Sequence, residues 1–429
     1  MMFGSPAPLL DMVTAQKQGM ARGIPSICSA HPVVLSAACH LARRSGAPLL
    51  IETTCNQVNH QGGYSGMTPA DFVRFLREIL EREGIPPQQV ILGGDHLGPY
   101  PWRKEPAETA IAQALEMVRA YVQAGYTKIA LDASMPCADD DPERPLPLER
   151  IARRAAQLCA AAEAAAGAVQ PVYVIGSEVP PPGGAQGQEA RLHVTTPQEA
   201  QAALDAFREA FLQAGLTPVW ERVIALVVQP GVEFGVDSIH AYQREAARPL
   251  KTFIEGVPGM VYEAHSTDYQ TRASLRALVE DHFSILKVGP ALTFAYREAV
   301  FALEHIEREI LGRQDMPLSR LSEVLDEVML NDPRHWQGYF AGAPAEQALA
   351  RRYSFSDRIR YYWHHPAAQE AVRRLLANLI ETPPPLSLLS QYLPREYEMV
   401  RAGEISSHPQ DLIRAHIQHT LEDYAAACG

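Results

Sequence analysis

The feature that most constrains the fold is an alternation of short apolar, β-favouring runs with helical patterns along most of the chain. Eight such runs occur, at residues 24–29, 48–53, 89–94, 127–132, 172–176, 222–228, 259–264 and 283–288. Strands that alternate with helices form parallel sheets, and eight strands are the number that closes a barrel. A doubly wound open sheet is the alternative, but no G-x-G-x-x-G fingerprint follows the first run. The sequence therefore predicts a (β/α)8 barrel over residues 1–312.

The rest of the chain has a different pattern. From Gly312 onwards the strand-like runs stop and helical periodicity continues, with aromatic-rich stretches and a break at Pro383–Pro385. A chain of 429 residues is too long for one small core, so a large domain with a smaller one is expected. We therefore predict a helical C-terminal domain over residues 313–429, attached to the barrel that carries the functional site.

Charge and cysteine usage exclude several classes of function. The formal net charge of -12 argues against a nucleic-acid partner, although a small anionic substrate needs only a local cationic pocket. The six cysteines show no C-x-x-C spacing and are expected as buried thiols in a reducing compartment. No basic segment followed by an apolar core is present near the N-terminus, and no apolar run approaches ~18 residues. We expect a cytoplasmic protein with no membrane partner.

Polar and titratable residues follow most of the strand-like runs. They are Ser29, Glu52, Asn56, Gln57, Asp95, His96, Asp132, Ser134, Glu178, Gln229, His265, Asp268 and Lys287. In a barrel, the loops after the strands converge on one mouth, where catalytic residues gather. His96, Glu178 and His265 together make a ligand set of the kind that holds Zn2+ or Mn2+. Because loops are polar in any barrel, the alternative that Asp95 and His96 are an ordinary turn acid and a surface histidine stays open.

Five segments carry a family resemblance: Gly93–Tyr100 (GGDHLGPY), Leu131–Met135 (LDASM), Gly176–Pro180 (GSEVP), Glu263–Asp268 (EAHSTD) and Tyr353–Trp363 (YSFSDRIRYYW). On these segments the chain resembles the class II tagatose-bisphosphate aldolase non-catalytic subunit family, a group that also includes sugar and sugar-phosphate 4-epimerases. The barrel is more distantly similar to that of the catalytic class II aldolases. That similarity implies a proton carrier at Asp95 and metal ligands at His96 and His265, with an Asp-x-Ser motif at Asp132 and Ser134.

Two departures from the catalytic aldolases bear on activity. Where those enzymes carry a further metal-binding histidine after strand six, this chain has Gln229-Pro230-Gly231. Their glycine-rich phosphate loop is replaced by Ser266-Thr267-Asp268, which adds a carboxylate beside an anion site. A carboxamide is a poorer zinc ligand than imidazole, so the ion must rely on Glu178 or be harder than zinc. Ordinary aldolase activity is therefore not expected.

The function expected from these residues is a metal-dependent 4-epimerase, an isomerase that interconverts D-tagatose and D-fructose, as 6-phosphates or free sugars, by breaking and re-forming the C3–C4 bond. One divalent ion, such as Zn2+ or Mn2+, would stabilise the enediolate, and a carboxylate would move the proton of the 4-hydroxyl. The alternatives are a non-catalytic subunit that stabilises a tagatose-1,6-bisphosphate aldolase, and a tagaturonate-type sugar-acid epimerase. A second copy of the chain or an aldolase chain is the expected protein partner.

The roles expected of individual residues follow from this mechanism. Asp95 and Asp268 are assigned as the acid/base pair, with Asp132 as an orienting residue. His96, Glu178 and His265 are the expected metal ligands, with Gln229 as a weaker fourth. The expected substrate-binding residues are Ser29, Asn56, Ser134, Ser266, Lys287 and Arg360. For the segment around Arg360, a packed helix with a structural arginine is an equally open alternative.

Overall fold

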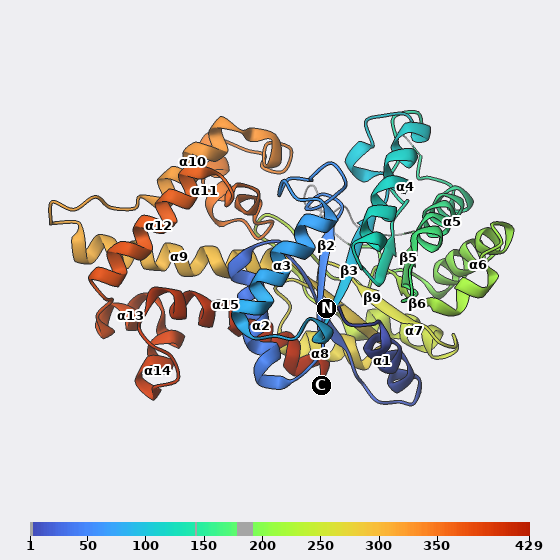
Figure 1. Cartoon of the computed structure of the whole chain (residues 1–429), viewed down its shortest axis with the longest axis horizontal. Coiled ribbons are helices and arrows are strands. Elements are labelled where there is room, and N and C mark those ends of the chain that lie inside the picture. Colours follow the sequence, from blue (N-terminus) through green and yellow to red (C-terminus); the bar gives the residue numbers. More distant parts are fainter. Residues whose placement is uncertain (1–2, 142–143, 178–191) are drawn as a thin grey trace.

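The computed structural model describes residues 3–141, 144–177 and 192–429, and its centre is a closed barrel of parallel strands (Figure 1). The strands follow one another round the barrel in the order β1-β10-β9-β6-β5-β4-β3-β2. They are β1 (Ile24–Cys28), β2 (Leu49–Thr54), β3 (Val90–Leu97), β4 (Lys128–Leu131), β5 (Val172–Gly176), β6 (Val223–Val227), β9 (Val261–Ala264) and β10 (Phe283–Val288). Each corresponds to one predicted apolar run, so the predicted (β/α)8 barrel is confirmed. A short hairpin, β7 (Glu233–Phe234) with β8 (Ile239–His240), was not predicted.

Helices surround the barrel. They are α2 (Pro32–Ser45), α3 (Pro69–Glu83), α4 (Ala107–Gln123), α5 (Leu148–Ala165), α6 (Pro197–Gln213), α7 (Arg244–Glu255) and α8 (Arg272–Glu280). The local sequence determines where a helix begins, as α3 shows. At α3, Thr68 and Asp71 cap each other's backbone amides while Pro69 occupies the first helical turn, an arrangement that satisfies amides with no partner inside the helix.

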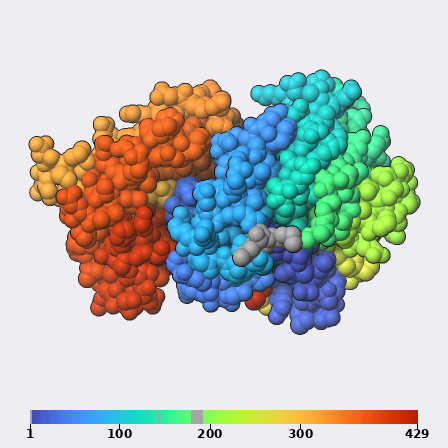
Figure 2. Space-filling view, viewed as in Figure 1, coloured from blue at the N-terminus to red at the C-terminus, as the bar shows by residue number. Residues whose placement is uncertain are grey.

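The C-terminal region is helical, as predicted, but its last helix returns to the barrel. After β10, α9 (Pro290–Leu311) leads away to α10 (Leu321–Asn331), α11 (Pro344–Tyr353), α12 (Pro366–Glu381), α13 (Leu386–Tyr392) and α14 (Pro394–Ala402). Figure 2 shows these orange and red segments as one mass beside the barrel. Then α15 (Pro409–Cys428) packs against α8, α9 and α2, which completes the ring of outer helices. The division into two domains at residue 312 stays a prediction.

The barrel interior is layered. At the N-terminal end of the strands, α1 (Ala7–Lys17) places Leu9, Met12 and Val13 against inward-facing apolar residues such as Leu50 and Ile91. This apolar layer closes the bottom of the barrel. None of the helices in the described ranges has the length and apolar character that a membrane-crossing segment needs.

A layer of charged side chains lies in the barrel interior beyond the apolar layer. Lys128, Glu52 and Glu263 have no exposed side-chain surface, and Lys287 is only 5% exposed. Barrel interiors are ordinarily filled by branched apolar residues, and a buried charge is costly unless it is paired. Here the charges pair with one another across the barrel, so this layer is a built polar network that supports the mouth above it.

Candidate functional site

The end of β3 delivers Asp95 and His96 to the same side of the backbone. Successive residues of a regular strand point to opposite faces. Here the pairing register with β4 shifts between Gly94 and Leu97, and His96 takes a left-handed conformation with φ 51. That conformation is rare for a residue with a side chain and is found mostly where a site requires it. Both side chains are buried, with Asp95 2% and His96 5% exposed.

The imidazole of His96 is oriented by Asp132. His96 Nδ1 lies 2.9 Å from Asp132 Oδ2, which leaves Nε2 as the nitrogen that faces Asp95, 3.7 Å away. Asp132 is itself held, since its Oδ1 accepts hydrogen bonds from the backbone amide of Ser134 at 3.1 Å and from its hydroxyl at 2.7 Å. Burial opposes the charged form of His96, but the carboxylates of Asp95 and Asp132 outweigh it and raise the pKa of the imidazole.

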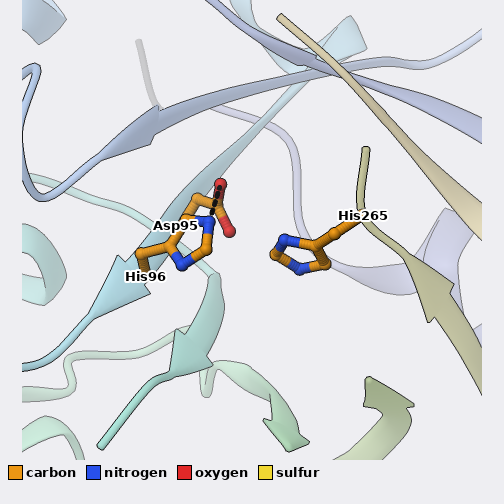
Figure 3. Close-up of side chains that lie close together, drawn as sticks. All are labelled: Asp95, His96 and His265. Atoms are coloured by element: carbon orange, nitrogen blue, oxygen red, sulfur yellow. Dashed lines mark ion pairs between the residues drawn. The ribbon is translucent and has the colours of Figure 1, made fainter. Parts of the chain in front are cut away.

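His265 approaches from the other side of the barrel. Its ring centroid lies 4.8 Å from that of His96, with the two rings nearly perpendicular at 80° (Figure 3). His265 Nε2 lies 3.2 Å from Glu263 Oε1, so Nδ1 is the nitrogen that Glu263 leaves available. Burial lowers the pKa of His265, which favours the neutral imidazole that binds metal. Ligand atoms of Asp95, His96 and His265 all lie within 4.8 Å of one another.

The charged layer in the barrel interior contacts Asp95 and His265 directly. Lys287 Nζ lies 2.9 Å from Asp95 Oδ1 and 2.5 Å from Glu52 Oε2. Lys128 Nζ lies 2.7 Å from Glu52 Oε1 and 2.6 Å from Glu263 Oε2. Burial raises the pKa of Asp95, but the charges of His96 and Lys287 outweigh it and hold the pKa well below its usual range.

Sequence reasoning missed the roles of Lys128 and Glu263. A signal was present, because each is a charged residue inside a run that otherwise predicts a buried strand. A charge at such a position must find an opposite charge or face a site.

A cavity of about 500 Å³ opens above the three residues. The predicted site residues that line it are Ser29, Asn56, Asp95, His96, His265, Ser266, Asp268, Lys287 and Arg360. Asp132 and Ser134 are not among the lining residues: Asp132 contacts His96, and Ser134 donates hydrogen bonds to Asp132. The carboxamide oxygen of Gln229 accepts hydrogen bonds from the amides of Gly231 at 2.8 Å and Val232 at 3.0 Å, so it is engaged in its own loop. Glu178 lies outside the described residues.

The C-terminal helical region forms part of the cavity wall. Tyr361 and Trp363 line the cavity, and the ring of His31 lies against Tyr296, at 4.3 Å between centroids, and near Trp363. Nη1 of Arg360 donates to the carbonyls of Ser356 at 2.5 Å and Asp357 at 2.9 Å. Arg360 was predicted at the site, and the structure places it in the cavity wall, but the sequence analysis missed the aromatic side chains of Tyr361 and Trp363 beside it.

The side chain of Asp268 caps the N-terminus of α9. Its Oδ1 accepts hydrogen bonds from the backbone amides of Gly289 at 3.0 Å and Ala291 at 2.8 Å. Burial raises the pKa of Asp268 to about 6, although these amide hydrogen bonds act in the opposite direction. One oxygen of the expected acid/base residue is therefore committed to the helix end.

Comparisons with known proteins cover nearly the whole chain. Residues 9–429 match the family described as D-tagatose-1,6-bisphosphate aldolase subunit GatZ/KbaZ-like. The D-tagatose-1,6-bisphosphate aldolase subunit GatZ of Klebsiella pneumoniae is 49% identical over 423 residues, which are 97% of this chain and 98% of that protein. A crystal structure described as a probable tagatose 6 phosphate kinase from Sinorhizobium meliloti is 47% identical, with a TM-score of 0.87, and covers 95% of this chain and 100% of that one.

These findings correct the functional expectation. The 4-epimerase prediction is wrong, because the matching family and the Klebsiella relative are aldolase subunits. The geometry gives a physical reason. Of the two carboxylates that were assigned as the acid/base pair, Asp95 is paired with Lys287 and one oxygen of Asp268 caps α9. With 49% identity over 97% of its length, the chain belongs to the GatZ/KbaZ-like family of D-tagatose-1,6-bisphosphate aldolase subunits.

Proposed function

We propose that this chain is a non-catalytic subunit of a D-tagatose-1,6-bisphosphate aldolase, in which it stabilises a separate aldolase chain. The observation that carries the proposal is the 49% identity with the Klebsiella subunit, which extends over 97% of the chain. The aligned region includes the C-terminal helices as well as the barrel. A surface that the Klebsiella subunit uses to bind another chain would therefore have a counterpart in this chain.

The electrostatics of the site favour a binding role over proton transfer. A general base works best with a pKa near the operating pH. Asp95 has a pKa well below its usual range because His96 and Lys287 stabilise its charged form, so it is a weak base. The second carboxylate, Asp268, has a pKa that burial raises to about 6, but two amides engage its Oδ1, which leaves only Oδ2 to accept a proton. Proton transfer by the Asp95–Asp268 pair is therefore limited, which is consistent with a cavity that binds a ligand.

The same cavity fits one divalent metal ion. Asp95, His96 and His265 would hold it, since two imidazoles and a carboxylate form a donor set that Zn2+ or Mn2+ accepts. Each histidine already has the outer partner that metal-binding histidines ordinarily have, Asp132 for His96 and Glu263 for His265. An ion at this position would supply Lewis-acid polarisation of a ketose carbonyl.

The hydroxyls of Ser29 and Ser266 and the carboxamide of Asn56 line the cavity and would bind sugar hydroxyls.

Reconstitution tests the proposal. The purified full chain is mixed with a purified tagatose-1,6-bisphosphate aldolase chain from the same organism, and aldolase activity is followed during incubation at raised temperature. We expect the two chains to co-elute in gel filtration and the half-life of aldolase activity to increase several-fold. The variant His96→Ala/His265→Ala, checked for cooperative melting, is the matched control and should stabilise the aldolase as well as the native chain does.

Two results would contradict the proposal. In the first, the chain alone cleaves tagatose 1,6-bisphosphate at a rate that the His96→Ala/His265→Ala substitution abolishes, which would make it an aldolase in its own right. In the second, no complex forms and the aldolase half-life is unchanged at any ratio of the two chains.

A further inference from the structure

The start of α9 is a position where barrels often bind phosphate. In barrel enzymes, substrate phosphate is frequently held between the loops after the seventh and eighth strands and the N-terminus of a helix, whose free amides and dipole attract anions. Here β9 and β10 are the seventh and eighth barrel strands along the chain, and α9 begins directly after β10 at Pro290. The residue before α9 is Gly289, which has no side chain with which to cap the helix.

In this chain a carboxylate already fills that position. Asp268, from the loop after β9, accepts hydrogen bonds through Oδ1 from the amides of Gly289 and Ala291 at 3.0 and 2.8 Å. Its side chain lines the cavity and is only 3% exposed. The carboxylate therefore occupies the place that a phosphate oxygen would take, and a phosphate could reach these amides only by displacing it.

A second buried carboxylate lies at the same helix end. Asp357 is 3% exposed, has a left-handed backbone with φ 44, and accepts a hydrogen bond from the hydroxyl of Thr293, in the first turn of α9, at 2.5 Å. At a slightly alkaline pH, where both carboxyls are ionised, their two negative charges oppose the binding of a dianion here, although the charge of Arg360 acts in the opposite direction.

The cationic side chains of the cavity are engaged as well. Among the described residues, the lysine and arginine side chains that line it are Lys287, Arg360 and Arg373. Lys287 pairs with Asp95 and Glu52, and Arg373 pairs with Glu370. Arg360 gives two hydrogen bonds to backbone carbonyls and a third, from Nη2, to the hydroxyl of Tyr361 at 3.1 Å. A phosphate would therefore have to compete with an existing ion pair at Lys287 and Arg373, and with three hydrogen bonds to neutral oxygens at Arg360.

We propose that Asp268 is a specificity-determining residue that keeps phosphate away from the start of α9, so that this end of the cavity takes the uncharged hydroxyl end of a ketose. A ketose 1,6-bisphosphate, which carries phosphate at both ends, is then excluded from this barrel. The inference rests on the proposed function in one respect, because it assigns the bisphosphate to the partner aldolase chain.

Titration of the full chain with inorganic phosphate tests the inference. Calorimetry at constant ionic strength and slightly alkaline pH compares the native chain with Asp268→Ala and Asp268→Asn. Alanine removes the charge and frees both amides, whereas asparagine removes the charge but keeps an oxygen that can accept from them. We expect no saturable binding to the native chain or to Asp268→Asn. Asp268→Ala should bind phosphate saturably, on the order of tenfold or more tightly than the weakest binding that the measurement on the native chain would detect, in line with an anion at a buried helix N-terminus.

A third variant guards against loss of the helix cap. Asp268→Ser also removes the charge, and its short hydroxyl can still cap a helix N-terminus while leaving room for an anion. Asp268→Ala and Asp268→Ser are first checked for cooperative melting. A crystal of either variant, soaked in phosphate, should show the anion at the amides of Gly289 and Ala291.

Two outcomes overturn the inference. One is saturable phosphate binding to the native chain that Asp268→Ala leaves unchanged or weakens. The other is a folded Asp268→Ala or Asp268→Ser variant that gains no phosphate affinity. Neither outcome depends on the partner, so a chain that fails to stabilise the aldolase yet gains phosphate binding in Asp268→Ala would refute the proposed function alone.

Discussion

The carboxylate of Asp95 lies 2.9 Å from the ammonium of Lys287, and this ion pair connects the candidate metal residues to the charged layer in the barrel interior. Lys287 also contacts Glu52, and Lys128 links Glu52 with Glu263. Because Glu263 orients His265 and Asp95 faces Nε2 of His96, both histidines of the site contact members of one buried network. Removing a single member should therefore affect stability and ligand geometry together.

The first prediction concerns Lys287. In Lys287→Met the apolar stem is kept but Asp95 and Glu52 lose a buried counter-charge. Breaking a buried pair by removing one partner leaves an uncompensated charge, so the free energy of unfolding should fall by about 3–5 kcal/mol. Denaturant unfolding measures it. Lys251→Met is the control, because Lys251 is 33% exposed and its buried partner Asp281 keeps an ion pair with Arg244, so the loss should be about 1 kcal/mol or less. Equal losses for the two variants would contradict the network.

The second prediction concerns the orientation of His96. Asp132→Ala removes the acceptor at His96 Nδ1, so the ring is no longer held with Nε2 toward Asp95. Loss of such an outer partner ordinarily lowers metal affinity by about 10–100-fold. Competition with a chromophoric chelator, using Zn2+ and Mn2+ in turn, measures the affinity of the full chain. Asp205→Ala, at a helix-surface position on α6, is the control and should leave the affinity unchanged. Equal affinities in the two variants would refute this role of Asp132.

The barrel could be predicted from sequence because its signal is local. Each strand is a short apolar run, and each polar residue behind it is carried to the same mouth by the geometry of a parallel barrel. Asp95, His96 and His265 were predicted as site residues in this way, and the structure brings their ligand atoms within 4.8 Å of one another. The left-handed backbone of His96 was not visible in the sequence, although the two preceding glycines mark the turn.

The remaining parts of the site depend on contacts between distant segments. Nothing near Lys128 in the sequence indicates that it pairs with Glu263, and the helical pattern after Gly312 does not indicate that Tyr361 and Trp363 reach the barrel mouth. The amide partners of Asp268 lie beyond the next helix and strand along the chain, so its capping role could not be distinguished from an acid/base role.

The third prediction concerns Gly98, directly after β3, where the chain passes close to Asp132 at the end of β4. A Cβ at this position would lie 1.5 Å from the carbonyl oxygen of Asp132, a backbone atom that cannot move without shifting the residue that orients His96. Gly98→Ala should therefore reduce the free energy of unfolding by about 3 kcal/mol or more, the upper range for overpacking. Thermal and denaturant unfolding measure the loss. Gly167→Ala, where a Cβ meets no atom within 4 Å, should be close to neutral. An unchanged free energy of unfolding in Gly98→Ala would contradict the prediction, because it would mean that the backbone near Asp132 can accommodate a Cβ at this position.

The last prediction uses the pH dependence of stability at Asp357. Burial raises the pKa of its carboxyl to about 7 in the folded chain, although the charge of Arg360 acts in the opposite direction. In the unfolded chain the pKa is about 3.9, so the folded state binds more protons between these two values. Stability contributed by the protonated carboxyl is therefore fully present below about pH 3.9 and lost as the pH rises through about 7.

Asp357→Asn should remove this loss, because asparagine stays neutral and can still accept the hydrogen bond from Thr293. The variant should gain stability relative to the native chain as the pH rises, by on the order of 2–4 kcal/mol between about pH 4 and pH 8. Unfolding free energies of the two proteins, measured at matched pH and ionic strength, give the difference directly. A difference that stays constant over this range, or that changes in the opposite direction, would show that the carboxyl is ionised in the folded chain at low pH and that Arg360 outweighs burial.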